Sequence, residues 1–273
     1  MSNWRTRNLG EMSWTEALDA AQSDPVVLLP VGTIEQHGPH LPLHEDSIVA
    51  EFVAKAVAEA TDALVAPTMM YGHSPTFRGY AGTINLRHET LTSVITDICE
   101  ELIRHGFRRI VVVNNNGGNT SPVATAATEL RAKHGVLIGT VYPWSIGYQL
   151  MRDEYDHPDK AFGHGAEPEL SAMLAMFPEQ VRMDAAEGGK LESFQGWHPT
   201  SYVSARIGDH SVPGTVYWDF SDVSPSGVTG DVTLASEKTG RVWIERVIGF
   251  CIDFVTEYDR NTRNLEAAPK AVE

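Results

Sequence analysis

Residues 33–46, which read TIEQHGPHLPLHED, concentrate side chains that bind metal ions directly after the apolar run PVVLLPVG. The segment holds three histidines and three acids, namely His37, His40, His44, Glu35, Glu45 and Asp46. Because Glu35 and His37 are two residues apart, their side chains point to the same side of an extended chain. One imidazole with two or three carboxylates suits Zn, Mn or Fe(II), and a carboxylate can bridge two such ions. The segment therefore favours a divalent metal site at the end of a buried strand.

Two of these residues also have ordinary structural interpretations. Asp46 stands at the start of the next predicted helix, where aspartate is a common N-cap. His37 alone could equally be a loop histidine held by hydrogen bonds. The joint occurrence of both after a buried strand favours metal binding, although the spacing is less diagnostic than a motif such as HExxH.

Strands and helices alternate along the chain. Apolar runs predict strands at 25–32, 63–72, 136–144 and from 107 towards a polar loop that ends at 119, and helical spacing predicts helices at 46–61, 87–106 and 121–135. Near-continuous Val/Ile/Leu strands separated by helices are typical of a parallel sheet that is covered on both faces. No repeat or linker interrupts this pattern, so we predict one domain over residues 1–273, with irregular functional loops at about 186–230.

Polar clusters follow these predicted strands. The segment 33–46 follows the first strand, NNNGGN (114–119) follows the third, and His164, Glu167 and Glu169 come just before an apolar helix. In open α/β sheets, ligands bind at the carboxyl ends of the strands. The clusters therefore lie where such folds bind their ligands.

The composition limits the classes of partner. A net charge of −15 argues against nucleic acid and anionic membranes. No run of about 18 apolar residues is present, and the first residues lack the apolar core of a signal peptide. Cys99 and Cys251 lie in apolar helical patterns and are expected to be buried free thiols. We expect a cytoplasmic protein that acts on a small molecule.

Five blocks of this sequence resemble the creatininase (creatinine amidohydrolase) family, in order and over most of the chain. VGTIEQHGPHLPLHEDS is similar to the family signature VGS-x-EQHGPHLP followed by an aspartate. YAGTINL, ELIRHGFRRIVVVNNNGGN, GHGAEPELSAML and GVTGDVTLASEKTG are similar to later blocks that contain FPGT, NGHGGN, HAGE-x-ETS and GDP-x-x-AS. The resemblance implies a three-layer α/β/α sandwich with a mostly parallel central sheet, which assembles as a homo-oligomer, often a hexamer.

The resemblance implies metal ligands at five positions. Glu35, His37 and Asp46 match ligands, and Asp46 matches the carboxylate that bridges two divalent ions, which are Zn, Mn or Fe. Glu167 matches a glutamate that binds the second ion in many members. The fifth position departs from the pattern, because Asn116 stands where the family has the ligand histidine of NGHGGN. An amide oxygen can bind a hard cation, but it is poorer than imidazole for Zn or Fe.

This departure allows three interpretations. Asn116 can be a natural substitution that shifts the preference towards Mn or weakens one ion. It can be an engineered change that disables the enzyme, or it can mark a natural protein that binds a ligand without turnover. The sequence alone leaves all three open.

His164 and Glu169 are the predicted catalytic residues. His164 matches the histidine of HAGE-x-ETS, which is placed to move a proton during ring opening. Glu169 matches the second glutamate, which either holds that histidine or binds metal. The expected reaction is hydrolysis of a carbon–nitrogen bond in a small cyclic amide or lactam by a metal-activated water. The alternatives are hydrolysis of a carbohydrate-like cyclic ketone or lactone, and ligand binding by a catalytically disabled protein.

Overall fold

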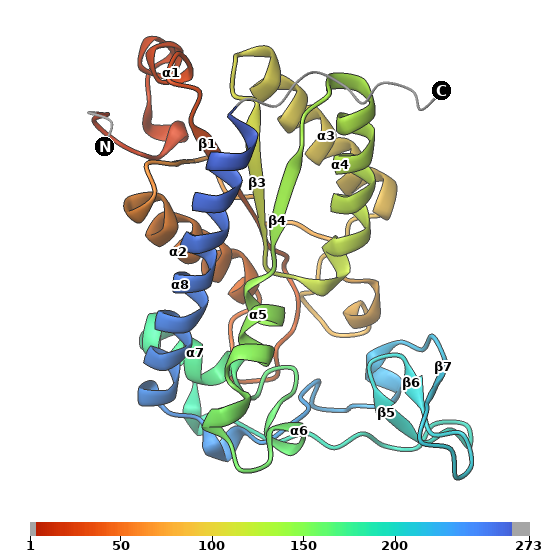
Figure 1. Ribbon diagram of the computed structural model, residues 1–273. Coiled ribbons are helices and arrows are strands. Elements are labelled where there is room, and N and C mark those ends of the chain that lie inside the picture. Colours follow the sequence, from red (N-terminus) through yellow and green to blue (C-terminus); the bar gives the residue numbers. More distant parts are fainter. Residues whose placement is uncertain (1–3, 264–273) are drawn as a thin grey trace.

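A four-stranded parallel sheet lies at the centre of the computed structural model, which describes residues 4–263 (Figure 1). The strands run in the order β2-β1-β3-β4, with bounds Leu64–Val65 (β2), Val26–Val31 (β1), Arg109–Asn114 (β3) and Ile138–Val141 (β4). Every residue of β1 and β3 is buried, as expected for near-continuous apolar strands. The prediction of one domain over residues 1–273 stays a prediction, and residues 1–3 and 264–273 lie outside the described part.

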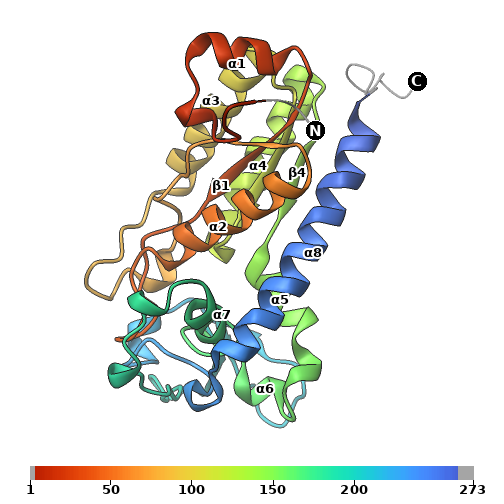
Figure 2. The same ribbon diagram turned by 90° about the vertical axis from the view of Figure 1, so that its left-hand side faces the viewer.

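Helices cover both faces of this sheet, which confirms the predicted α/β/α sandwich (Figure 1, Figure 2). Leu28 and Val111 pack on the side of α2 and α8, whereas Leu29 and Val112 pack on the side of α3 and α4. This alternation is the period of two that a strand buried on both faces produces. The helices are Trp14–Ala21 (α1), Glu45–Ala60 (α2), His88–Arg104 (α3), Thr120–His134 (α4), Pro143–Leu150 (α5), Pro158–Ala161 (α6), Glu169–Met176 (α7) and Glu237–Thr262 (α8).

Two predicted strands are shorter than their apolar runs. The run at 63–72 forms a strand only at Leu64–Val65, and the ladder stops before Pro67, which has no backbone N–H to donate. The run at 136–144 ends as a strand at Val141, because Pro143 occupies the first position of α5.

The segment 186–230, which we call the excursion, holds a second sheet instead of being irregular throughout. Its three antiparallel strands are Pro199–Ser201 (β5), Ser204–Ala205 (β6) and Gly214–Thr215 (β7). Strands of two or three residues are too short to show a period-two pattern in the sequence. A small core of its own supports this sheet, made of Phe77, Ala205, Trp218, Phe220 and Val223.

The strands β1 and β3 are neighbours at the point where the strand order reverses. The chain runs from β1 outward to β2 and then returns to the other side of β1 for β3 and β4. In parallel sheets, such a switch point opens a crevice at the carboxyl ends of the two strands. The segments 33–46 and 114–119 leave β1 and β3 at this crevice.

Both cysteines are buried free thiols, as predicted, with Cys99 in α3 and Cys251 in α8. Burial raises the pKa of each thiol to about 12, so both stay protonated at neutral pH. Within residues 4–263, no helix combines the length and the apolar character that crossing a membrane would need.

Alanine at Gly240 is expected to destabilise the protein, whereas alanine at Gly249 in the same helix should stabilise it slightly. A Cβ at Gly240 would lie 1.9 Å from the carbonyl oxygen of Ser171 in α7, but a Cβ at Gly249 meets nothing within 4 Å. Gly240→Ala would force α7 and α8 apart, which should lower the free energy of unfolding by about 1–3 kcal/mol. Gly249→Ala should raise it by up to about 1 kcal/mol through better helix propensity. Chemical denaturation of both variants measures the difference, and equal free energies of unfolding would contradict this close helix contact.

Candidate metal centre

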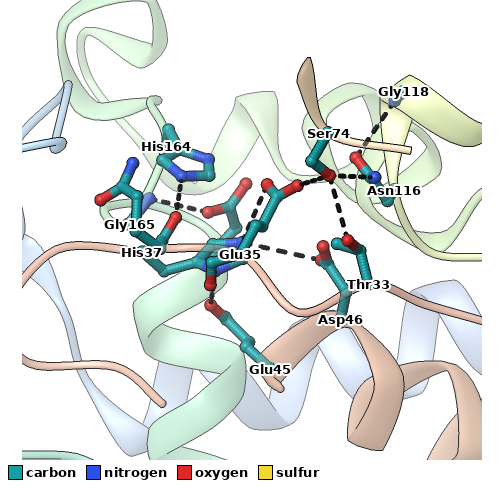
Figure 3. A network of polar contacts seen from close by, with 12 residues as sticks. Thr33, Glu35, His37, Glu45, Asp46, Ser74, Asn116, Gly118, His164 and Gly165 are labelled. Atoms are coloured by element: carbon teal, nitrogen blue, oxygen red, sulfur yellow. Dashed lines mark hydrogen bonds and ion pairs between the residues drawn. The ribbon is translucent and has the colours of Figure 1, made fainter. Parts of the chain in front are cut away.

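Glu35 and His37, which follow β1, lie buried beside each other (Figure 3). His37 Nε2 is 3.7 Å from Glu35 Oε1, and His37 Nδ1 is 3.2 Å from the carbonyl oxygen of Glu35. Since a carbonyl oxygen only accepts, Nδ1 carries the proton of the neutral ring and Nε2 keeps a free lone pair. Burial lowers the pKa of His37 well below its usual value, so the ring is neutral at physiological pH. His37 therefore presents Nε2 as a ligand atom on the side of the Glu35 carboxylate.

Asp46 joins this pair from the first turn of α2. The helix begins at Glu45 with His44 as its N-cap, so the interpretation of Asp46 as the N-cap is wrong. Asp46 Oδ1 lies 3.7 Å from His37 Nε2 and accepts a hydrogen bond of 2.8 Å from Trp144 Nε1. Its Oδ2 is buried without a hydrogen-bond partner. Such an oxygen is unfavourable unless a proton or a cation meets it.

Four buried carboxylates surround His37, namely Glu35, Glu45, Asp46 and Glu169. Burial raises the pKa of Glu35 to about 8 and that of Glu169 to about 7. It also raises the pKa of Glu45 and Asp46 well above their usual values, and the charge of Glu169 raises the pKa of the other three carboxyls further. In the described part of the chain, the only basic side chain in ion-pair contact with Glu35, Glu45 or Asp46 is His37.

This donor set fits a divalent cation. Carboxylates and one imidazole are ligands that Mn and Zn accept, and a cation supplies the positive charge that the group lacks. Ligand atoms of two groups lie within 4.8 Å of one another, namely Glu35, His37 and His164, and His37, Glu45 and Glu169.

Asn116 lines the same cavity, and both ends of its amide group make hydrogen bonds. Oδ1 accepts a hydrogen bond of 3.1 Å from Gly118 N, and Nδ2 donates to Ser74 Oγ at 2.9 Å and to the carbonyl oxygen of His73 at 3.2 Å. Ser74 in turn donates to Glu35 Oε2 (Figure 3). Asn116 therefore fixes Glu35 through Ser74, and the oxygen that it could offer to a metal already accepts one hydrogen bond.

Glu167 and Glu169 are two residues apart but have different surroundings. Glu167 accepts a hydrogen bond of 2.6 Å from Ser171 Oγ and does not line the cavity. Glu169, the first residue of α7, lines the cavity and accepts a hydrogen bond of 2.9 Å from the Tyr148 hydroxyl. Of the two, Glu169 is the one whose carboxylate reaches the group around His37.

His164 is the middle ring of a stack of three. Its ring centroid lies 4.3 Å from that of Phe77 on one side and 4.3 Å from that of His37 on the other. His164 Nε2 donates to the carbonyl oxygen of Gln36 at 2.6 Å, so the neutral ring keeps Nδ1 as an acceptor. Burial lowers the pKa of His164 to about 4, and the hydrogen bond to Gln36 opposes this shift. An imidazole held in this way can take up and release a proton at Nδ1.

A cavity of about 990 Å³ opens over these side chains. Its floor contains Glu35, His37, Asp46 and Glu169, and residues 199–203 of the excursion form part of its wall. This volume is at the upper end of what drug-sized ligands occupy, so the cavity has room for more than a single small ring.

The other two histidines of segment 33–46 have structural places. His40 donates from Nε2 to the carbonyl oxygen of Gly165 at 2.7 Å. This hydrogen bond joins segment 33–46 to the segment that contains His164. His44 is half-buried at the start of α2. Neither belongs to a candidate ligand group within residues 4–263.

Three residues of the site, namely Glu45, Ser74 and Tyr148, were not among the ligands and catalytic residues predicted from the sequence. Ser74 and Tyr148 lie in segments without a metal-binding pattern, so no signal in the sequence could have found them. Glu45 had one signal, because it is an acid directly before Asp46 in the segment 33–46 that follows a buried strand. Adjacent residues in a first helical turn can both face a crevice at the sheet edge, and here both do.

Comparison with known proteins gives the class of this chain. It is 29% identical over 266 residues to the creatinine amidohydrolase of Pseudomonas putida, covering 91% of this chain and 94% of that protein. It is 33% identical over 246 residues to the mycofactocin precursor peptide peptidase of Mycolicibacterium smegmatis, covering 87% of each. A solved creatininase described as the Mn form, 28% identical, matches with a TM-score of 0.73 over 95% of this chain and 100% of that chain. The chain is thus similar over most of its length to an amidohydrolase, a peptidase and a solved creatininase.

The family follows from a match over most of the chain. A family model described as creatinine amidohydrolase matches residues 10–255. The chain belongs to the creatininase family, which confirms the resemblance of the five sequence blocks. A mutant creatininase described as the Zn–Zn type also matches, at 27% identity and a TM-score of 0.73 over 95% of this chain and 99% of that chain. Structural relatives of this chain therefore carry Mn or Zn.

Proposed function

We propose that this chain is a divalent-metal-dependent hydrolase that cleaves an amide or lactam carbon–nitrogen bond. The main support is the group of four buried carboxylates around His37. Such a group is stable when cations compensate its charge. The similarity to a creatinine amidohydrolase supports the type of bond that is cleaved.

Glu35, His37, Asp46 and Glu169 are the side chains that would hold the metal. Asp46 has an unpartnered Oδ2, and His37 presents Nε2 on the side of Glu35 and Asp46. Glu169 takes the place that the resemblance implied for Glu167, because Glu169 lines the cavity and Glu167 does not. Divalent cations bound there polarise a substrate carbonyl and lower the pKa of a coordinated water.

His164 is the side chain that we assign to proton transfer. Its Nε2 is committed to the Gln36 carbonyl, and stacking on Phe77 and His37 holds the ring in place. Nδ1 of the neutral ring can accept a proton from the attacking water and return it to the leaving nitrogen. Glu169 also contacts Tyr148, whose hydroxyl fixes one carboxylate oxygen.

Histidine in place of Asn116 is expected to raise the metal content per subunit. Asn116 offers only a neutral amide oxygen, which also accepts a hydrogen bond from Gly118, whereas an imidazole is a ligand that suits Zn and Mn better. Elemental mass spectrometry of both proteins, prepared side by side, measures the difference. Asn261→His on the exposed surface of α8 controls for the added imidazole and should leave the metal content unchanged.

The result also decides what Asn116 does. Two ions per subunit in the unchanged protein, without gain in the variant, would make Asn116 an accommodated substitution. Full hydrolytic activity after exhaustive metal removal would contradict the proposed function. Ligand binding without turnover, even in Asn116→His, would make this chain a binding protein.

A short peptide is the second candidate substrate beside a small cyclic amide. The cavity of about 990 Å³ has room for one, and one relative is a peptide peptidase. A screen of cyclic amides and short peptides for release of a new amine separates the two classes. A carbohydrate-like ring belongs in the same screen, because the chain is 24% identical over 242 residues to the 3-dehydro-scyllo-inosose hydrolase of Thermotoga maritima, covering 82% of this chain and 75% of that protein. Hydrolysis of such a ring would release no amine.

Homo-oligomer assembly and a cytoplasmic location stay predictions. The first comes from the family resemblance, and the second comes from the two free cysteines.

A further inference from the structure

Glu45 is a buried acid with no ordinary structural partner. It is the first residue of α2, and it is fully buried. Neither Oε1 nor Oε2 has a hydrogen-bond partner. A glutamate at such a position normally points to solvent or caps its own helix, so its burial calls for a different explanation.

The nearest polar atom explains the position of this carboxylate. Glu45 Oε2 lies 3.4 Å from His37 Nδ1, as the dashed contact in Figure 3 shows. Nδ1 is the protonated nitrogen of the ring, because it also faces the carbonyl oxygen of Glu35 at 3.2 Å. Glu45 therefore lies behind the imidazole, while Asp46 Oδ1 and Glu35 Oε1 lie on the opposite, Nε2 side.

We infer that Glu45 is a positioning residue for His37, which holds the ring from its Nδ1 side and makes Nε2 a stronger metal ligand. A carboxylate behind a metal-binding imidazole fixes the tautomer and the orientation of the ring and raises its basicity. The orientation and the basicity of the His37 ring both matter, because within residues 4–263 it is the one histidine in ion-pair contact with both Glu35 and Asp46. The inference rests on the proposed metal centre. It goes beyond that centre by assigning a role to Glu45, which lies outside the four side chains that we propose as ligands.

The test measures Mn²⁺ affinity by calorimetry on protein that was first stripped with a chelator. Glu45→Gln keeps the size of the side chain and removes its charge. We expect it to weaken Mn²⁺ binding about ten- to a hundredfold, while the melting temperature of the metal-free protein stays equal or rises. Glu59→Gln, on the exposed end of the same helix, should leave both quantities unchanged.

A second variant separates charge from packing. Glu45→Asp keeps the charge on a shorter side chain, so we expect it to bind Mn²⁺ more tightly than Glu45→Gln does. Equal affinities of the two variants, or a lower melting temperature of metal-free Glu45→Gln, would mean that Glu45 acts through packing and would overturn the inference.

A third variant, His37→Ala, shows whether a negative result concerns the role of Glu45 alone or the proposed metal centre as a whole. If His37→Ala loses Mn²⁺ binding while Glu45→Gln binds as the unchanged protein does, the metal centre stands and the role of Glu45 is wrong. If His37→Ala also binds Mn²⁺ normally, the proposed metal centre itself is wrong.

Discussion

Asparagine in place of Asp46 is expected to remove at least one metal ion per subunit and to lower kcat/KM by about a thousandfold or more. Asp46 has a buried, unpartnered Oδ2 and lies between His37 and Trp144. Asparagine has the same shape, and its oxygen can still accept the Trp144 hydrogen bond, so the fold should be kept. Loss of the charge removes a ligand that can bridge two ions, and metal ions contribute several kcal/mol to such reactions, which corresponds to about three powers of ten in rate.

The measurement of Asp46→Asn has two parts. Metal content comes first, because it needs no known substrate, and kcat/KM follows on whichever amide the screen identifies. Asp97→Asn on the exposed surface of α3 is the control and should behave as the unchanged protein does. Unchanged metal content together with unchanged activity in Asp46→Asn would remove Asp46 from the site.

Removal of the metal should destabilise the protein more at pH 8 than at pH 5.5. In the metal-free protein, burial raises the pKa of Glu35 to about 8 and that of Glu169 to about 7, from an ordinary value of 4.5. The folded chain therefore binds more protons than the unfolded chain between about pH 4.5 and 8, so its free energy of unfolding falls as pH rises through this window. Bound cations compensate the ionised carboxylates, so the metal-loaded protein should not show this loss.

Thermal unfolding with and without chelator at both pH values tests this prediction. A cation at about a thousand times its Kd stabilises by about 4 kcal/mol, which corresponds to roughly 8 °C or more for a chain of this size. We expect a gap of this order at pH 8 and a much smaller one at pH 5.5. Glu169→Gln should reduce the pH dependence of the chelated sample. A gap that is equal at both pH values, or larger at pH 5.5, would contradict the assignment of these acids to a metal centre.

The central sheet could be predicted because its strands are buried on both faces. The run VVLLPV in β1 is apolar at every position, and this pattern leaves few alternatives to a strand between two helix layers. The position of the polar clusters at the carboxyl ends of the strands followed from the same reasoning, since parallel strands bring these ends to one edge. The excursion could not be predicted, because its strands are short and its small core is assembled from distant residues such as Phe77 and Trp218.

The candidate site shows the same limit at the level of single residues. Spacing and resemblance placed both Glu167 and Glu169 near the site, but they could not say which carboxylate faces the cavity. That choice depends on where α7 begins and on the hydrogen bonds from Ser171 and Tyr148, which are tertiary contacts. The role of Asn116 also depends on its contacts, because its residue type suggested only a weak ligand. The hydrogen bonds of its amide group to Gly118 and Ser74 are tertiary and local contacts that the residue type does not predict.

The excursion has a small core that is separate from the two cores on the faces of the central sheet. The candidate metal ligands and part of the cavity wall therefore belong to different packing units. The proposed metal ligands follow β1 or stand on α2 and α7, whereas part of the cavity wall stands on the excursion. Phe77 joins them, because it belongs to the excursion core and stacks on His164. In proteins with this arrangement, substitutions in the excursion can change which molecules the cavity admits, while the candidate metal ligands stay the same.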